Sequence, residues 1–123
     1  MKSLTFVVVD DAVFMRTLLK KMLEEVDEYV VVGEGANGYE AIDLAKNKQP
    51  DIMTLDITMP DLDGISAVKE ILSVSPDTKI IMVSAMGQQS MVIEAIKLGA
   101  KDFVVKPFEK SRVLQAVRNV IAL

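Results

Sequence analysis

The chain has 123 residues, contains neither cysteine nor histidine, and carries a formal net charge of −4. A length of this order predicts a single domain over residues 1–123, with no output domain. The lack of cysteine excludes disulfides and zinc-thiolate sites, and the lack of histidine excludes serine-histidine triads and histidine-ligated metals. The chemistry left to the chain is that of carboxylates, hydroxyls and lysine.

The charge balance and the apolar runs restrict the possible partners. An acidic chain argues against nucleic-acid binding, and we expect no membrane insertion because no apolar run approaches about 18 residues. The amino terminus lacks the features of a signal peptide, so we expect a cytoplasmic protein. The charge is uneven: residues 1–62 hold six basic and twelve acidic side chains, whereas from Lys97 onward six basic side chains face two acidic ones.

Short apolar segments alternate with segments of helical spacing along the whole chain. In chain order, the sequence predicts a strand at 4–9 and a helix around 15–26, a strand at 29–32 and a helix around 41–45, and a strand at 52–55 and a helix around 65–72. A strand at 80–83, a helix around 91–96, a strand at 103–105 and a helix around 113–121 follow. The strands are almost wholly apolar, which is typical of parallel strands buried on both faces. This (βα)5 alternation predicts an α/β fold with helices on both faces of one sheet.

Several residues are expected to mark the ends of helices. Gly99 follows the fourth predicted helix, and Pro50 and Pro76 follow the second and third. We expect Ser111 to cap the fifth helix and Asp63 to begin the third rather than to bind metal.

A G-x-G-x-x-G pattern at residues 33–38 lies between a predicted strand and a predicted helix, as in dinucleotide-binding sites. A dinucleotide site would place this pattern after the first strand of a larger sheet, and here it follows the second. Carboxylates such as Asp56 would also repel a pyrophosphate. We therefore interpret Gly35 and Gly38 as residues that shape the loop into the second helix.

Polar side chains follow four of the predicted strands. They are Asp10 and Asp11 after the first strand, Asp56 after the third, Ser84 after the fourth and Lys106 after the fifth. Because ligands of such sheets bind at the carboxyl ends of the strands, we expect these side chains to meet at one edge.

The chemistry of this group indicates phosphoryl transfer. Three carboxylates repel one another, and hard oxygen ligands suit Mg²⁺, so we expect this cofactor as the neutralising cation. Lys106 and the Ser84 hydroxyl would supply a positive charge and a donor to an anionic tetrahedral group. With no cysteine or histidine, a carboxylate is the expected nucleophile, and we choose Asp56, at the end of a central strand.

The whole chain resembles the receiver domain of two-component response regulators. The resemblance rests on five motifs in order: Val8-Val9-Asp10-Asp11, Leu55-Asp56-Ile57-Thr58-Met59-Pro60-Asp61-Leu62-Asp63-Gly64, Val83-Ser84-Ala85, Gly99-Ala100-Lys101-Asp102-Phe103 and Val105-Lys106-Pro107-Phe108. It implies a flavodoxin-like doubly wound sheet of five parallel strands in the order 2-1-3-4-5.

The resemblance also implies roles for the residues at the strand ends. Asp56 would accept a phosphoryl group from the phosphohistidine of a kinase, and Lys106 would pair with the phosphoryl oxygens. Mg²⁺ would be held by Asp11, Asp56 and the backbone carbonyl of Thr58, with Asp10 acting through water. The Lys106-Pro107 peptide bond would be cis.

A switch is implied as well. Ser84 would turn inward to bond the phosphoryl group, which the backbone N–H of Ala85 would also contact, and Phe103 would follow by moving from exposed to buried. Phe103 stands where chemotaxis receivers often carry tyrosine, so a switch here would work without a phenolic hydroxyl. Ser84 stands where such receivers frequently carry threonine, and the resemblance places Thr58 and Met86 at positions that in receivers influence phosphoryl lifetime.

The segment from Ser84 to Lys97 is most similar to single-domain chemotaxis receivers. That similarity implies three partners: a chemotaxis histidine kinase as phosphodonor, the flagellar motor switch protein, and an aspartyl-phosphate phosphatase. We expect a monomer that is no enzyme, since it would catalyse only its own phosphorylation and dephosphorylation. The expected partner face consists of Met91, Lys97, Lys101, Phe103 and Arg112.

Three alternatives remain open. The chain could be a receiver excised from a transcriptional or other multidomain response regulator. It could be a Mg²⁺-dependent aspartyl-phosphate phosphatase, although only Asp10 and Asp11 are available near Asp56 as a general acid or base. It could also be a receiver-like binding module that never takes up phosphate.

Overall fold

The computed structural model describes residues 3–123, which form five strands and five helices in strict alternation. They are β1 Leu4–Val9, α1 Val13–Glu24, β2 Tyr29–Gly35, α2 Gly38–Lys48, β3 Ile52–Asp56, α3 Gly64–Val74, β4 Lys79–Ser84, α4 Gln89–Leu98, β5 Asp102–Val105 and α5 Lys110–Ile121. The predicted (βα)5 pattern is therefore confirmed. No helix within these residues is long and apolar enough to cross a lipid bilayer.

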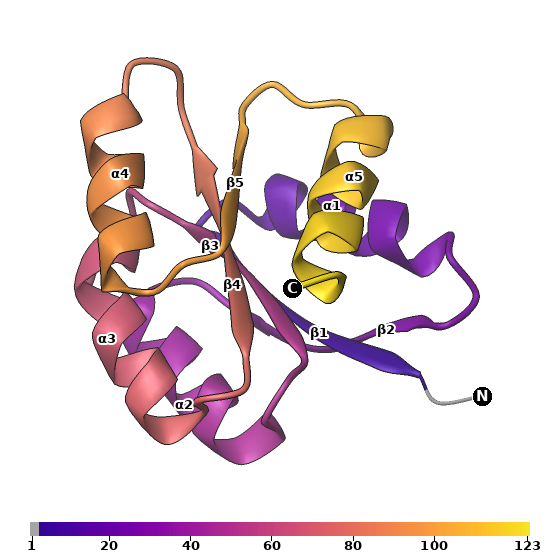
Figure 1. The fold of residues 1–123 in the computed structure, drawn as a ribbon, viewed down its shortest axis with the longest axis horizontal. Coiled ribbons are helices and arrows are strands. Elements are labelled where there is room, and N and C mark those ends of the chain that lie inside the picture. Colours follow the sequence, from indigo (N-terminus) through magenta and orange to yellow (C-terminus); the bar gives the residue numbers. More distant parts are fainter. Residues whose placement is uncertain (1–2) are drawn as a thin grey trace.

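The strands form one parallel sheet in the order β2-β1-β3-β4-β5, as the resemblance implied. Helices α1 and α5 cover one face of this sheet, and α2, α3 and α4 cover the other (Figure 1). The order changes direction between β1 and β3, because the chain winds outward from β1 to β2 and then returns past β1 to β3. In open α/β sheets, this switch point is where ligands bind, beyond the carboxyl ends of the strands.

Each face of the sheet has its own apolar core. Along β1, Phe6 and Val8 pack under α1 and α5, whereas Val7 and Val9 pack under α2 and α3. The three central strands are therefore buried almost throughout. The prediction of burial on both faces is wrong for the edge strands β2 and β5, which are half-exposed because the helices cover mainly the middle of the sheet.

Most of the predicted helix ends are observed, and one is wrong. Asp63 begins α3 as expected, because its Oδ1 accepts the backbone N–H of Ser66 at 2.8 Å. Gly99 ends α4 with a φ of +126°, which favours glycine. Ser111 does not cap α5: the helix begins one residue earlier, and Glu109 occupies the cap position without a side-chain hydrogen bond.

The glycine pattern at residues 33–38 forms no phosphate-binding loop. Gly33 and Gly35 lie within β2, which extends three residues beyond its predicted end. Asn37 caps α2 by accepting the N–H of Glu40 at 2.9 Å, so this donor at the helix start already has a partner.

Candidate functional site

Three carboxylates meet at the carboxyl edge of the sheet. Val9 of β1 pairs with Leu55 of β3, so the residues that follow in register, Asp10 and Asp56, lie side by side. One carboxylate oxygen of each of Asp10, Asp11 and Asp56 lies within 4.8 Å of the others. Asp10 and Asp56 are buried and Asp11 is exposed, so the cluster opens toward solvent on the Asp11 side.

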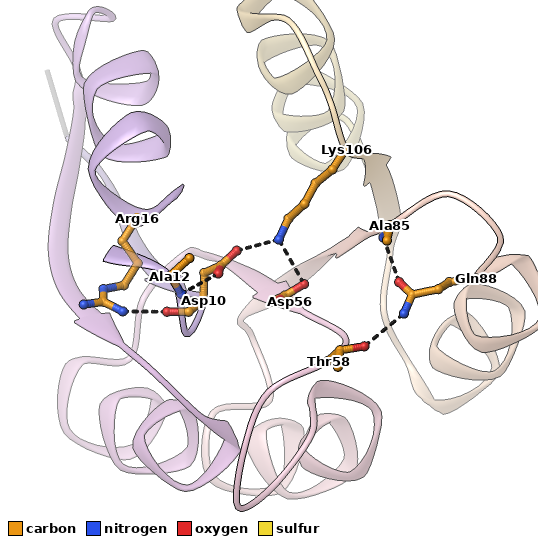
Figure 2. A network of polar contacts seen from close by, with 8 residues as sticks. All are labelled: Asp10, Ala12, Arg16, Asp56, Thr58, Ala85, Gln88 and Lys106. Atoms are coloured by element: carbon orange, nitrogen blue, oxygen red, sulfur yellow. Dashed lines mark hydrogen bonds and ion pairs between the residues drawn. The ribbon is translucent and has the colours of Figure 1, made fainter. Parts of the chain in front are cut away.

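Lys106 approaches this cluster from the end of β5. Its Nζ lies 2.9 Å from Asp10 Oδ2 and 3.4 Å from Asp56 Oδ1, so one ammonium is shared by two carboxylates (Figure 2). The backbone N–H of Lys106 donates to the carbonyl of Ser84 at 2.7 Å, and the Lys106-Pro107 bond is cis. The β4 and β5 ends are thereby tied together beside the carboxylates.

Asp10 also positions the start of α1. Its Oδ1 accepts the N–H of Ala12 at 2.9 Å, and its backbone carbonyl accepts from Arg16 at 2.7 Å (Figure 2). Because Lys106 donates to Oδ2, both side-chain oxygens of Asp10 already have a protein partner. Asp56 and the exposed Asp11 are the carboxylates with more free lone pairs for a ligand.

The electrostatics of the cluster shift two pKa values. Burial raises the pKa of Asp56 to about 6, the charge of Asp10 adds to the rise, and Lys106 opposes it. Burial also lowers the pKa of Lys106, but its hydrogen bond to Asp10 and the charges of Asp56 and Asp10 outweigh this, so that its pKa is raised. The site therefore brings three carboxyl groups together with one ammonium.

These residues fit a hard divalent cation. Mg²⁺ is commonly held by one or two carboxylates while it keeps several waters, and here three carboxylate oxygens lie close together with one side open. A cation beside them would offset the repulsion from Asp10 that contributes to the raised pKa of Asp56. The cluster is thus a candidate metal centre.

A tight loop brings α3 against the end of β3. Gly64 donates its N–H to the carbonyl of Ile57 at 2.9 Å. A Cβ at position 64 would collide with the backbone carbonyl of Asp56, so only glycine allows this approach. Thr58 lies in the same loop, exposed, two residues beyond Asp56.

One residue that the sequence did not indicate joins two loops of the site. Gln88 Oε1 accepts the N–H of Ala85 at 2.7 Å, and Gln88 Nε2 donates to Thr58 Oγ1 at 2.9 Å (Figure 2). The other site residues end a strand or lie within two residues of its end, whereas Gln88 lies four residues beyond β4 and reaches the site only through the turn of its loop. No signal in the sequence alone would have found it.

The two expected switch residues lie in the neighbouring strands β4 and β5. Ser84, the last residue of β4, is buried, and Phe103 in β5 is about one-third exposed. Phe103 lines an apolar groove of about 380 Å³ that runs from the end of β4 along α4, together with Met86, Ile93, Ile96 and Val105. Arg112 of α5 holds β5 in place by donating to the carbonyl of Phe103 at 2.6 Å.

The residues of the expected partner face lie in different parts of the surface. Phe103 lines the groove, and the Arg112 guanidinium lies 6.0 Å from the centroid of the Phe103 ring. Met91 lies on the other side of α4, in a depression shared with α3, and Lys101 lies in a third depression near Pro76, at the opposite end of β5. Lys97 is exposed on α4. The sequence prediction grouped these residues by helical spacing and charge. Phe103, Met91 and Lys101 nevertheless line different depressions, because these are formed with different neighbouring elements.

A doubly wound sheet with two buried aspartates at its switch point, and a lysine that reaches them from the end of β5, is the arrangement expected of receiver domains, and comparison with known proteins agrees. The model of the response regulator receiver domain family matches residues 6–118. The chain belongs to this family. It is 57% identical over 113 residues to the chemotaxis protein CheY of Thermotoga maritima, which covers 92% of this chain and 93% of that protein.

Two further relatives are similarly close in sequence. The chemotaxis protein CheY of Listeria monocytogenes is 53% identical over 94% of this chain and 97% of its own length. A protein named CcdB from Bacillus subtilis is 54% identical over 93% of this chain and 94% of its own length.

Solved structures show the same fold. The response regulator domain of Thermotoga maritima CheB is 34% identical, with a TM-score of 0.90 over 99% of this chain and 98% of that one. In a complex from Borrelia burgdorferi described as CheX-CheY-BeF3-Mg+2, the matching chain is 35% identical, with a TM-score of 0.91 over 98% of this chain and 90% of that one. The chain is therefore similar in sequence and in fold to chemotaxis receivers.

Proposed function

We propose that the chain is a phosphorylation-activated response regulator of chemotaxis. Asp56 accepts a phosphoryl group from a histidine kinase, and the phosphorylated form binds the flagellar motor switch. The observation that supports this most directly is the shared ammonium of Lys106 between Asp10 and Asp56, within a cluster of three carboxylates at the switch point of the sheet.

The reaction follows from the state of Asp56. With a pKa of about 6, its carboxylate is largely ionised at neutral pH and can act as a nucleophile. One oxygen attacks the phosphorus of the kinase phosphohistidine, and a phosphorus–oxygen bond forms as the phosphorus–nitrogen bond breaks. The imidazole leaves with the bonding electron pair and takes a proton from solvent. Lys106, 3.4 Å from Asp56 Oδ1, then pairs with a phosphoryl oxygen.

Mg²⁺ would be held in this proposal by Asp11, Asp56 and the backbone carbonyl of Thr58. Asp10 acts through water in this proposal, because both of its side-chain oxygens already accept hydrogen bonds from Ala12 and Lys106. Bound there, Mg²⁺ supplies positive charge against the phosphoryl oxygens. A CheY from another organism is described in complex with BeF3 and Mg2+, which supports the assignment.

The output is proposed to follow from residues at the ends of β4 and β5. The Ser84 hydroxyl and the Ala85 N–H bond the phosphoryl group, and Phe103 moves inward beside the groove that the motor switch protein occupies. The chain catalyses only its own phosphorylation and dephosphorylation, and an aspartyl-phosphate phosphatase resets it. The complex described as CheX-CheY, in which a second protein holds a chemotaxis receiver, supports the existence of such a partner.

A phosphotransfer experiment tests this proposal. A chemotaxis histidine kinase is labelled with radioactive phosphate and mixed with wild type, Asp56→Asn or Asp61→Asn, the last being an exposed aspartate of the same loop. Wild type and Asp61→Asn should take up label and then bind a peptide of the motor switch protein, and Asp56→Asn should do neither. Labelling of Asp56→Asn at the wild-type level would contradict the proposal.

A second candidate output is supported by one finding. Not all close relatives carry a chemotaxis name, since the 54% identical protein of Bacillus subtilis is named CcdB. A receiver that is phosphorylated normally but ignores the motor-switch peptide would point to such a different output.

A further inference from the structure

The side chain of Gln88 spans the two loops that flank Asp56. Its Oε1 accepts from Ala85 in the loop after β4, and its Nε2 donates to Thr58 in the loop after β3, at 2.7 and 2.9 Å. Figure 2 shows this bridge on one side of Asp56 and Asp10 on the other, with the Lys106 nitrogen between the two carboxylates. Gln88 is half-buried and occupies the position just before α4, where its side chain caps no helical N–H.

The N–H that Gln88 occupies lies beside the phosphoacceptor. Asp56 pairs with Val83 across β3 and β4, so Ala85 follows two residues beyond that pairing, at the same edge of the sheet. Under the proposed function, this N–H donates to a phosphoryl oxygen on Asp56. A single N–H cannot point straight at two acceptors, and a bent hydrogen bond is weaker. The phosphoryl group and the Gln88 side-chain carbonyl therefore compete for the Ala85 N–H.

We propose that Gln88 is a positioning residue that holds the Ala85 N–H in the unphosphorylated protein and is displaced when Asp56 is phosphorylated. This inference rests on the proposed function, because it needs a phosphoryl group at Asp56. The Gln88 amide oxygen is a neutral acceptor, whereas a phosphoryl oxygen is charged and accepts the same hydrogen bond more strongly. The phosphoryl oxygen therefore displaces the Gln88 oxygen from the Ala85 N–H. The affinity of the site for the phosphoryl group is lowered, because the hydrogen bond to Gln88 is lost.

Displacement of Gln88 reaches beyond the site because of where the residue lies. Gln88 lines the apolar groove together with Met86, Ile93 and Phe103, directly before the first turn of α4. Its release also frees the Thr58 hydroxyl, so that the loops after β3 and β4 lose their direct side-chain link. Occupancy of the phosphoryl site is thereby coupled to the start of α4 and to one end of the groove.

The test measures the affinity of the full chain for beryllofluoride, a phosphoryl mimic, in saturating Mg²⁺ by isothermal titration calorimetry. Gln88→Ala removes the competing acceptor and should bind the mimic about fivefold more tightly than wild type, the value of one neutral hydrogen bond. Thr58→Val removes one of the two contacts that hold Gln88 and should give a smaller increase. Gln89→Ala is the matched control, since Gln89 is the neighbouring exposed glutamine with no side-chain bond to either loop among the described residues, and its affinity should be unchanged.

Thermal unfolding without the mimic separates this role from a purely structural one. If Gln88 only braces the loop, Gln88→Ala lowers the melting temperature and leaves the affinity unchanged or weaker, and the inference is overturned. Slower loss of phosphate from Gln88→Ala at unchanged beryllofluoride affinity would also overturn it, because Gln88 would then act on the attacking water. A wild type that takes up neither phosphate nor beryllofluoride contradicts the proposed function itself, whereas wild-type binding with no gain in Gln88→Ala contradicts this inference alone.

Discussion

Asp56 is a buried acid, and the neighbouring residues balance its negative charge only in part. Lys106 lies 3.4 Å from one of its oxygens, but the same ammonium lies closer to Asp10, at 2.9 Å. Burial, with the charge of Asp10 second, therefore raises the pKa of Asp56 to about 6. Such an acid is largely ionised at neutral pH, and a cation placed beside it stabilises the ionised form.

The first prediction concerns the stability cost of this acid. The folded pKa of about 6 lies above the ordinary value of 3.8, so the native state holds the proton more tightly than the unfolded chain. Stability therefore falls as pH rises between these two values, and the full cost remains above the folded pKa. Asp56→Asn removes it and should stabilise the metal-free protein at neutral pH by about 1–3 kcal/mol, at about 1.4 kcal/mol per pKa unit.

Urea unfolding in the absence of divalent metal measures this difference. The gain of Asp56→Asn should disappear at a pH below 3.8, where Asp56 is protonated in both states. Asp77→Asn, an exposed aspartate far from the cluster in sequence, is the control and should show no such gain. Equal stabilities of wild type and Asp56→Asn at neutral pH would show that the charge is already compensated.

The second prediction concerns Thr54, which lies in β3 two residues before Asp56. Its Oγ1 is buried and has no hydrogen-bond partner among the described residues. Thr54→Val should therefore stabilise the protein by about 1 kcal/mol, since the desolvated hydroxyl is removed at nearly constant shape. Thr78→Val is the matched control and should destabilise, because the Thr78 hydroxyl is also buried but donates to the carbonyl of Pro50 at 2.7 Å. Denaturant unfolding of both variants checks the two signs.

The site residues that could be predicted from the sequence are those at the end of a strand or directly after one. Asp10, Asp56 and Lys106 directly follow or end strands, and parallel strands bring such positions to one edge, so their meeting followed from the order of the elements alone. Gln88 could not be predicted in this way. Its contacts with Ala85 and Thr58 depend on how two loops fold toward each other, and spacing along the sequence does not determine this.

At the scale of the element, α3 is held in place at its first turn. Asp63 accepts the N–H of Ser66 through Oδ1 and the hydroxyl of Ser66 through Oδ2, at 2.8 and 3.0 Å. Gly64, the next residue, packs against the carbonyl of Asp56. The cap thus fixes the loop that carries Thr58 as well as the helix.

The third prediction follows from this cap. Asp63→Ala should lower the free energy of unfolding by about 1 kcal/mol, because the N–H of Ser66 loses its acceptor. Glu70→Ala, on the exposed side of the same helix, should change stability by less than about 0.5 kcal/mol. Chemical unfolding measures both values, and an Asp63→Ala variant as stable as Glu70→Ala would show that solvent replaces the cap fully.

The elements themselves were predicted well in type and order, and less well at their ends. β2 extends to Gly35 because its backbone continues to pair with β1 after the apolar run stops. The cap of α5 was misplaced because Ser111 is a good capping residue, yet the helix begins one residue earlier, at Lys110. β2 therefore ends where its pairing with β1 ends, whereas no side-chain hydrogen bond marks the start of α5.

At the scale of the whole molecule, the proposed phosphoryl site and the apolar groove adjoin each other. Ser84 and Ala85 belong to the proposed site and also line the groove, whose other walls include Ile93, Ile96 and Phe103. Under the proposed function, phosphorylation at the carboxyl edge of the sheet acts on residues that also line the surface proposed for the partner.

The fourth prediction separates the contribution of the groove to partner binding from that of the basic side chains from residue 97 onward. Ile96→Asp should weaken binding of the phosphorylated chain to a motor-switch peptide by about tenfold or more, because an apolar contact in the groove is lost and a charge is added. Lys101→Glu should weaken it by at most about threefold, since Lys101 lies in a separate depression and acts only as a distant charge. Fluorescence anisotropy of the labelled peptide measures both. Equal losses for the two variants would assign binding to charge rather than to the groove.

The measurement that tests the central claim most directly is the intact mass of the full chain after incubation with acetyl phosphate. We predict that wild type gains one phosphoryl group in the presence of Mg²⁺ and none when the metal is chelated, and that Asp56→Asn gains none in either case. Lys106→Ala should show how far the adduct depends on the shared ammonium. A wild type that never gains a phosphoryl group, or an Asp56→Asn variant that gains one as readily as wild type, would contradict the account.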